Sequence, residues 1–201
     1  MRIVLIVEGR TEEAFKPALK EFLRRILGRH PPTIEVDRCD GLVPRQDHLK
    51  RRVVKHLASG ADAVVALTDV RPDFEDARDA NEKMRRWVGE ECRFHPHAAQ
   101  YDFEAWLLPY WDVIREITGC TMNSPGNSPE RVNHTRPPAE WIKEAFRTGA
   151  RTRGRRSYSK TRDAKRILEG QDLSVAAEKC RELAKLLNTL LEISGGDPVF
   201  K

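Results

Sequence analysis

Acidic side chains follow directly after the two most apolar stretches of this sequence. The first stretch, RIVLIV (2–7), leads into EGRTEE, and the second, ADAVVALTD, ends at Asp69, with Asp73 four residues later. Two carboxylates about 4 Å apart repel each other by roughly 4 kcal/mol at an effective dielectric constant near 20. Acids that converge on one point therefore need a cation, a shared proton or a basic partner.

A hard divalent cation is one solution to this repulsion. Mg²⁺ and Mn²⁺ prefer carboxylate oxygens together with water and phosphate oxygens. We therefore predict a metal site formed by Glu8, Asp69 and Asp73, with Mg²⁺ or Mn²⁺ as the cofactor. Glu12 and Glu13 also have a second interpretation, because acids in the first turn of a helix oppose the helix dipole favourably. Glu12 fits both interpretations.

The elements that would position these acids alternate between strands and helices. The short, branched runs 2–7 and 61–69 are typical of strands buried in a parallel sheet, and weaker strand patterns cover 33–36 and 92–99. Helical periodicity predicts helices over 46–59, 75–90, 103–118, 139–147, 161–169 and 173–193, and one that is kinked at Pro17 or begins near Phe15 and stops at Gly28. We predict an α/β fold with a mostly parallel sheet of about four strands between helices and a helical C-terminal region.

The carboxyl edge of such a sheet is where ligands bind, and Glu8 and Asp69 both belong to it. Residues 1–118 are predicted to form the α/β core. Residues 119–201 are predicted to add a loop, a basic segment and C-terminal helices that pack on this core, as one domain with an appendage. The loop, 119–138, is rich in Asn, Ser, Pro and Gly.

The segment 147–166 carries nine basic residues and one acid. Its cations could follow a phosphate backbone, so we predict nucleic-acid contacts from five of them; the alternative is a solvated charge run. The net charge of +5, from 36 basic and 31 acidic residues, is compatible with a DNA or RNA partner without requiring one. The five predicted contacts are Arg151, Arg153, Arg155, Arg156 and Lys160.

A third acidic cluster lies in QYDFEAW (100–106), where Asp102 and Glu104 flank Phe103 at a predicted helix start. One acid could reach the metal site while the other caps the helix. The alternative is that Asp102 is a plain helix cap, with Phe103 and Trp106 in the core.

Four stretches together resemble a known family: IVEGRTEEAF, VVALTDVRPDF, AAQYDFEAWLL and SKTRDAKRIL. They are similar, in this order, to the small bacterial Toprim-like proteins grouped as domain of unknown function 4276. More distantly they resemble the Toprim domains of topoisomerases, primases and the overcoming-lysogenisation-defect nucleases. The resemblance spans most of the chain and implies a Toprim-like, Rossmann-like fold.

The resemblance also implies roles for individual residues. Glu8 would be a metal ligand or general acid/base, Glu12 the second Glu of nuclease-type Toprim domains, and Glu104, rather than Asp102, a site residue. Lys160 would lie near the acidic edge. The match departs at Arg71, which stands where Toprim domains place the second Asp of a D-x-D motif, and Asp73 is the nearest substitute.

These observations favour a Mg²⁺-dependent nucleic-acid phosphodiesterase, and the resemblance suggests phage defence beside a separately encoded ATPase. One alternative is a non-catalytic module that binds nucleic acid or a partner and keeps a remnant metal site. Another is that the acids pair with Arg71 and Lys160 and bind no metal. Four scattered cysteines without a C-x-x-C pair, and no long apolar segment, favour a cytoplasmic protein without a membrane partner. The oligomeric state stays open.

Overall fold

The computed structural model describes residues 1–39, 43, 45–131, 136–151 and 157–201, without the side chains of residues 10–13. Four strands form one sheet in the order β2-β1-β3-β4, and all three pairings are parallel. The predicted α/β fold with a parallel sheet of about four strands is thus confirmed. The strands are β1 (Arg2–Val7), β2 (Thr33–Arg38), β3 (Ala63–Asp69) and β4 (Phe94–Ala99).

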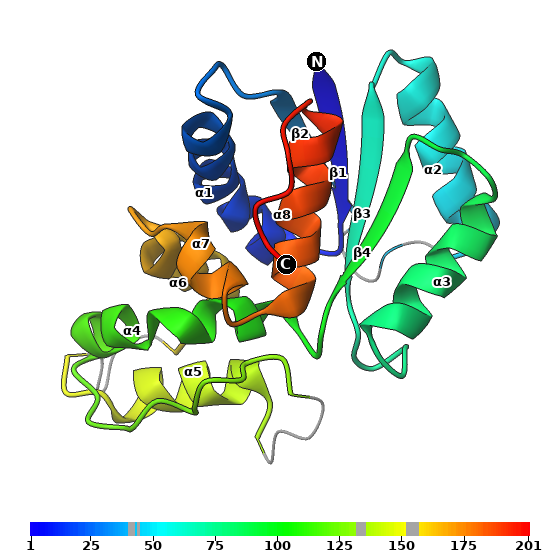
Figure 1. The fold of residues 1–201 in the computed structure, drawn as a ribbon. Helices are drawn as coiled ribbons and strands as arrows, with labels where there is room; N and C mark the ends of the chain where they lie inside the picture. Colours follow the sequence, from blue (N-terminus) through cyan, green and yellow to red (C-terminus); the bar gives the residue numbers. More distant parts are fainter. Residues whose placement is uncertain (40–42, 44, 132–135, 152–156) are drawn as a thin grey trace.

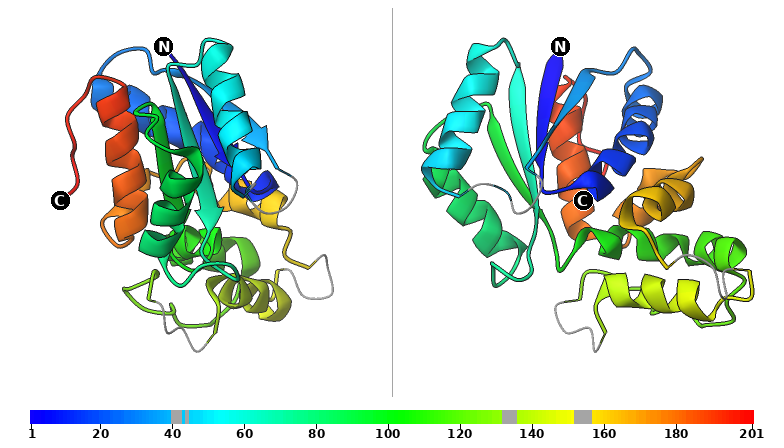
Figure 2. Two further views of the ribbon diagram at one scale, coloured as in Figure 1. Left: turned by 90° about the vertical axis from the view of Figure 1, so that its right-hand side faces the viewer. Right: turned by 180° about the vertical axis from the view of Figure 1, so that it is seen from behind.

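Helices cover both faces of this sheet (Figure 1). Helices α2 and α3 lie on one face, and α1 and α8 lie on the other. Figure 2 shows that α4 and α5 lie beyond the carboxyl ends of the strands. The helices are α1 (Arg10–Leu27), α2 (Asp47–Ala58), α3 (Ala77–Val88), the 3₁₀ helix η1 (Phe103–Tyr110), α4 (Trp111–Thr118), α5 (Pro138–Thr148), α6 (Lys160–Leu168), α7 (Leu173–Ala177) and α8 (Arg181–Ile193).

The two faces of the sheet bury two separate clusters, because successive side chains of a strand point to opposite sides. Ile3 and Leu5 face the cluster under α1 and α8, whereas Val4 and Ile6 face the cluster under α2 and α3. The larger cluster contains residues from both predicted parts of the chain, 1–118 and 119–201.

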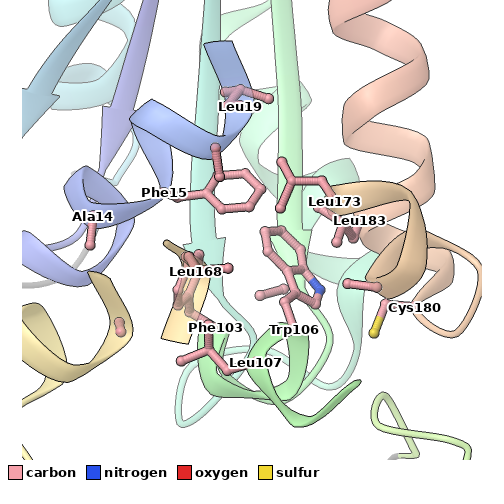
Figure 3. Packing of buried hydrophobic residues seen from close by; sticks show 14 of the residues in the cluster. Ala14, Phe15, Leu19, Phe103, Trp106, Leu107, Leu168, Leu173, Cys180 and Leu183 are labelled. Atoms are coloured by element: carbon pink, nitrogen blue, oxygen red, sulfur yellow. The ribbon is translucent and has the colours of Figure 1, made fainter. Parts of the chain in front are cut away.

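An aromatic group at the end of β1 and β4 joins α1 to η1 (Figure 3). Phe15, Phe103 and Trp106 are fully or almost fully buried, and their ring centroids lie 5.5 to 5.9 Å apart. Such contacts add to the free energy of burial. They hold η1, with Glu104 in its first turn and Asp102 just before it, against the carboxyl edge of the sheet.

Three helix predictions differ from the structure. Helix α1 begins at Arg10 rather than near Phe15, and it continues through Pro17 because its buried face holds the helix against the core. The predicted helix 103–118 begins as a 3₁₀ helix, and Pro109 within it lacks the N–H that an α-helical bond to residue 105 requires.

The third difference lies in the predicted helix 173–193, which is divided into α7 and α8. The carboxylate of Asp172 accepts the Ser174 N–H at the start of α7. The carboxylate of Glu130 accepts the Glu182 N–H at the start of α8. Because Glu130 comes from a distant loop, the sequence pattern of 173–193 does not show where the second helix begins. Among the described residues, no helix is long and apolar enough to span a bilayer.

Candidate functional site

Glu8 and Asp69 meet at the carboxyl edge of the sheet. Strands β1 and β3 are neighbours, and their register pairs Val7 with Leu67, so Glu8 lies beside Thr68. Glu8 Oε1 accepts the Asp69 backbone N–H at 3.0 Å and the hydroxyl of Thr68. Asp69 Oδ1 in turn accepts the Phe103 N–H at 2.8 Å. This bond ties the end of β3 to the start of η1.

The environment of Glu8 favours its protonated form. Burial raises its pKa, the hydrogen bonds from Thr68 and from the Asp69 N–H lower it, and the net direction is upward. The negative charge of Asp73 contributes to the rise, and the positive charge of Lys160 opposes it. A carboxylate with a raised pKa can accept and release a proton closer to neutral pH than an ordinary Glu.

Asp73 and Arg71 lie in the turn after β3 and have different surroundings. The negative charge of Asp73 raises the pKa of Glu8, but the Asp73 carboxylate itself pairs with Arg45 at 2.5 Å. The exposed guanidinium of Arg71 lies over the ring of Tyr101, 5.6 Å from its centroid. The cation that replaces the second Asp of the D-x-D pattern is therefore placed against an aromatic ring.

Glu104 is completely buried and has a basic partner. The Lys160 Nζ atom lies 3.1 Å from Oε1 and 3.2 Å from Oε2 of Glu104, and the Tyr158 hydroxyl donates to Oε1 at 3.4 Å. Burial lowers the pKa of Lys160, but Glu104, Asp69 and Asp102 raise it, and the net pKa is raised. Lys160 is thus a fixed positive charge among carboxylates from β3 and η1.

Asp102 is the acid of this cluster whose hydrogen bonding is incomplete. Its Oδ1 atom is buried and has no hydrogen-bond partner among the described residues, and its side chain makes no cap bond at the start of η1. Burial, together with the negative charge of Glu104, raises the pKa of Asp102 to about 7. Lys160 acts in the opposite direction. The backbone N–H groups of Ala139 and Ala105 also lower the pKa of Asp102, so its carboxylate keeps contacts with the backbone of α5 and η1.

Of the five predicted nucleic-acid contacts, the structure describes Arg151 and Lys160, and it places them in different surroundings. Lys160 lies in the acidic cluster. Arg151 Nη1 donates to the Glu116 carbonyl at 2.7 Å, so its guanidinium binds the last turn of α4. Arg153, Arg155 and Arg156 lie outside the described residues. The side chain of Glu12 also lies outside the description, although its backbone belongs to α1.

The residues of this edge are compatible with a magnesium site that substrate completes. Within the described part of the chain, no group of three or more His, Cys, Asp or Glu side chains is arranged to hold a metal ion. Mg²⁺, however, is usually bound by one or two carboxylates together with waters and substrate phosphates. Glu8 and Asp69 supply two carboxylates, and the unpartnered oxygen of Asp102 shows that the cluster can still accept a cation or proton.

Sequence reasoning missed three partners in this cluster. Thr68, which directly precedes Asp69, could have been found from the parallel register beside Glu8. Arg45 and Tyr158 carry no such signal, because loops that only the tertiary structure places bring them to Asp73 and Glu104.

Several solved structures are similar to this chain at low sequence identity. The C-terminal region of the OLD protein of Xanthomonas campestris pv. campestris is 18% identical, with 94% of this chain and 95% of that chain covered and a TM-score of 0.46. The C-terminal region of the Burkholderia pseudomallei OLD protein is 15% identical, with 95% and 97% covered and a TM-score of 0.49. TM-scores this low carry no argument about function.

A comparison with curated proteins gave no significant match. A family profile, by contrast, covers most of the chain, including both acids at the strand ends, η1 and Lys160. Its description is "Domain of unknown function (DUF4276)", and the matched residues are 7–191. The chain therefore belongs to the DUF4276 family.

Proposed function

We propose that this protein is a Mg²⁺- or Mn²⁺-dependent phosphodiesterase that cuts nucleic acid. The observation that carries the proposal is the bond from the Asp69 N–H to the carboxylate of Glu8 at the carboxyl edge of two adjacent strands. It holds the Glu8 carboxylate against the backbone of Asp69 where parallel α/β sheets bind ligands, beside the buried Glu104 and its half-exposed partner Lys160.

Each side chain has a distinct part in this proposal. Glu8 and Asp69 would hold the cation, with Asp73 joining them when it leaves Arg45. A bound Mg²⁺ would supply Lewis acidity toward a phosphoryl oxygen and lower the pKa of water. Glu8, whose pKa burial raises, is suited to take the proton from the attacking water.

Lys160 and Glu104 would act as a pair on the substrate. The ammonium group of Lys160 is close to Glu104 and interacts with Asp69, so it can face a phosphate bound at the edge. A fixed positive charge there stabilises the negative charge that develops on phosphoryl oxygens. Glu104 keeps the lysine charged and oriented. Glu12 stays a predicted ligand or base.

A second candidate function is a nucleic-acid- or partner-binding module without catalysis. Two ion pairs favour it, because Lys160 with Glu104 and Arg45 with Asp73 already compensate acidic charge without a metal. Phage defence and a separately encoded ATPase partner are further proposals that come from the family resemblance alone.

The test is incubation of the purified protein with labelled single- and double-stranded DNA and RNA, in Mg²⁺, Mn²⁺ or EDTA. We expect cleavage that needs the metal and falls by about a hundredfold or more in Glu8→Gln and in Asp69→Asn. Glu90→Gln is the matched control, since this exposed acid lies between α3 and β4, at the opposite edge of the sheet.

Three outcomes separate the candidates. Cleavage that persists in the Glu8→Gln/Asp69→Asn double variant overturns the proposed site. Salt-sensitive binding without cleavage favours the module. Calorimetric titration with Mn²⁺ adds an independent readout: a stoichiometric signal that Asp69→Asn removes supports the metal site, and no signal in the wild type refutes it.

A further inference from the structure

A polar cavity of about 330 Å³ lies beside the carboxyl end of β4. Gln100, the residue that follows β4, lines it together with Ser128 and Arg131 of the loop before α5, Lys179 of the turn between α7 and α8, and Arg181, the first residue of α8. Gln100 precedes Asp102 by two residues, so the cavity lies at the same carboxyl end of the sheet as the proposed site. Its volume leaves room for a phosphate group and part of its sugar.

Gln100 gives this cavity a hydrogen-bond donor. Its side chain is only 8% exposed. The Oε1 atom accepts the Ala77 N–H at 2.9 Å, at the start of α3. This bond fixes which end of the amide is the oxygen, and the Nε2 donor has no partner among the described residues. The Nε2 atom stays open to solvent, so water can satisfy it in the free protein and an incoming acceptor can replace that water.

The charges around the cavity favour an anion as that acceptor. Arg131, Lys179 and Arg181 line it, and none of the three has an ion pair within the described part of the chain. Two carboxylates, Glu130 and Glu182, also line the cavity but have other partners.

Glu130 accepts the Trp106 indole N–H at 2.8 Å and the Glu182 N–H at 3.0 Å. Glu182 pairs with Lys185 at 2.7 Å. The three cations are therefore left to face the cavity without a carboxylate committed to them.

We propose that this cavity binds a backbone phosphate of the nucleic-acid strand whose neighbouring phosphodiester lies at the acidic edge. The inference rests on the proposed function and adds a second contact for its substrate. Gln100 donates to a phosphate oxygen, the hydroxyl of Ser128 donates to another, and Arg181 and Lys179 supply positive charge. A phosphate held here fixes the strand relative to Glu8 and Asp69 and carries no base specificity.

The test is binding of a fluorescent oligothymidylate to the full chain in EDTA, which makes it independent of cleavage. Gln100→Glu retains an oxygen for the Ala77 N–H but replaces the donor with a negative charge, and we expect affinity to fall about tenfold or more. Arg181→Gln, on the surface, should lower the salt dependence of binding by about 0.7 in log–log slope. Lys50→Gln, with the same charge change on the exposed face of α2, should leave both unchanged beyond a small general effect.

Inorganic phosphate serves as the second probe. The proposal is overturned if oligonucleotide affinity is the same in Gln100→Glu, Arg181→Gln and Lys50→Gln. This holds even if Gln100→Glu loses binding of inorganic phosphate, because the cavity would then bind a free anion and not the nucleic-acid strand. A wild-type protein that binds no oligonucleotide in EDTA refutes this inference, whereas the proposed function is decided separately by the cleavage assay in Mg²⁺ or Mn²⁺. Oligonucleotide binding that needs Gln100, without any cleavage, supports the cavity and refutes only the nuclease.

Discussion

Replacement of Asp102 by Asn should change how the stability of this protein depends on pH. Burial and the charge of Glu104 raise the pKa of Asp102 from 3.8 to about 7, although Lys160 opposes the rise. The folded protein therefore holds the Asp102 proton more tightly than the unfolded chain does. The contribution of this proton to the free energy of unfolding is at its full value below about pH 4. It decreases as the pH rises and is lost above about pH 7.

The size of this effect follows from the pKa difference. From 3.8 to about 7 is a shift of about 3 units, and each unit corresponds to 1.36 kcal/mol. The wild-type protein should thus lose about 4 kcal/mol of unfolding free energy from Asp102 across this range. Asn cannot ionise, so Asp102→Asn should lack this loss and become more stable than the wild type at alkaline pH.

Urea unfolding at a series of pH values measures the difference between the two proteins. Glu90→Gln is the control, because its exposed side chain removes a carboxylate without burial. If the difference between Asp102→Asn and the wild type is the same at acidic and alkaline pH, Asp102 is not a buried acid with a raised pKa. The electrostatic description of the cluster would then be wrong.

Two further predictions concern the same region. Lys160→Met removes the partner of a fully buried carboxylate and should destabilise the protein by about 2 kcal/mol near neutral pH. Adding Glu104→Gln to this variant should restore most of the lost stability, as measured by thermal unfolding. If the effects of the two substitutions simply add, the pairing of Lys160 with Glu104 is refuted. Gly149→Ala should cost about 1 to 3 kcal/mol, since its Cβ would lie 2.3 Å from the Thr118 carbonyl oxygen. An unchanged unfolding midpoint would contradict that contact. Gly149 has a φ of −64°, which alanine adopts without strain, so the loss would come from the clash, whereas Gly126→Ala, at a φ of 108° in open space, shows what backbone strain alone costs.

Local patterns predicted much of the architecture. The stretches 3–7 and 63–67 are buried strand segments, because short runs of branched and small apolar residues are typical of the centre of a parallel sheet. Their common direction places Glu8 and Asp69 at one edge, so their proximity followed from topology alone. One failure came where a distant residue decides a boundary, at α8, whose first turn is capped by Glu130.

Residue types and near-neighbour spacing were enough to predict the fold class, the DUF4276 resemblance and the acids at the strand ends. Tertiary structure decided their partners. Lys160 and Tyr158 reach Glu104 across more than fifty residues of sequence. The cavity beside Gln100 is formed by the loop before α5 and by residues between α7 and the first turn of α8. Such contacts depend on how helices pack, and no local periodicity encodes the point at which two distant loops meet.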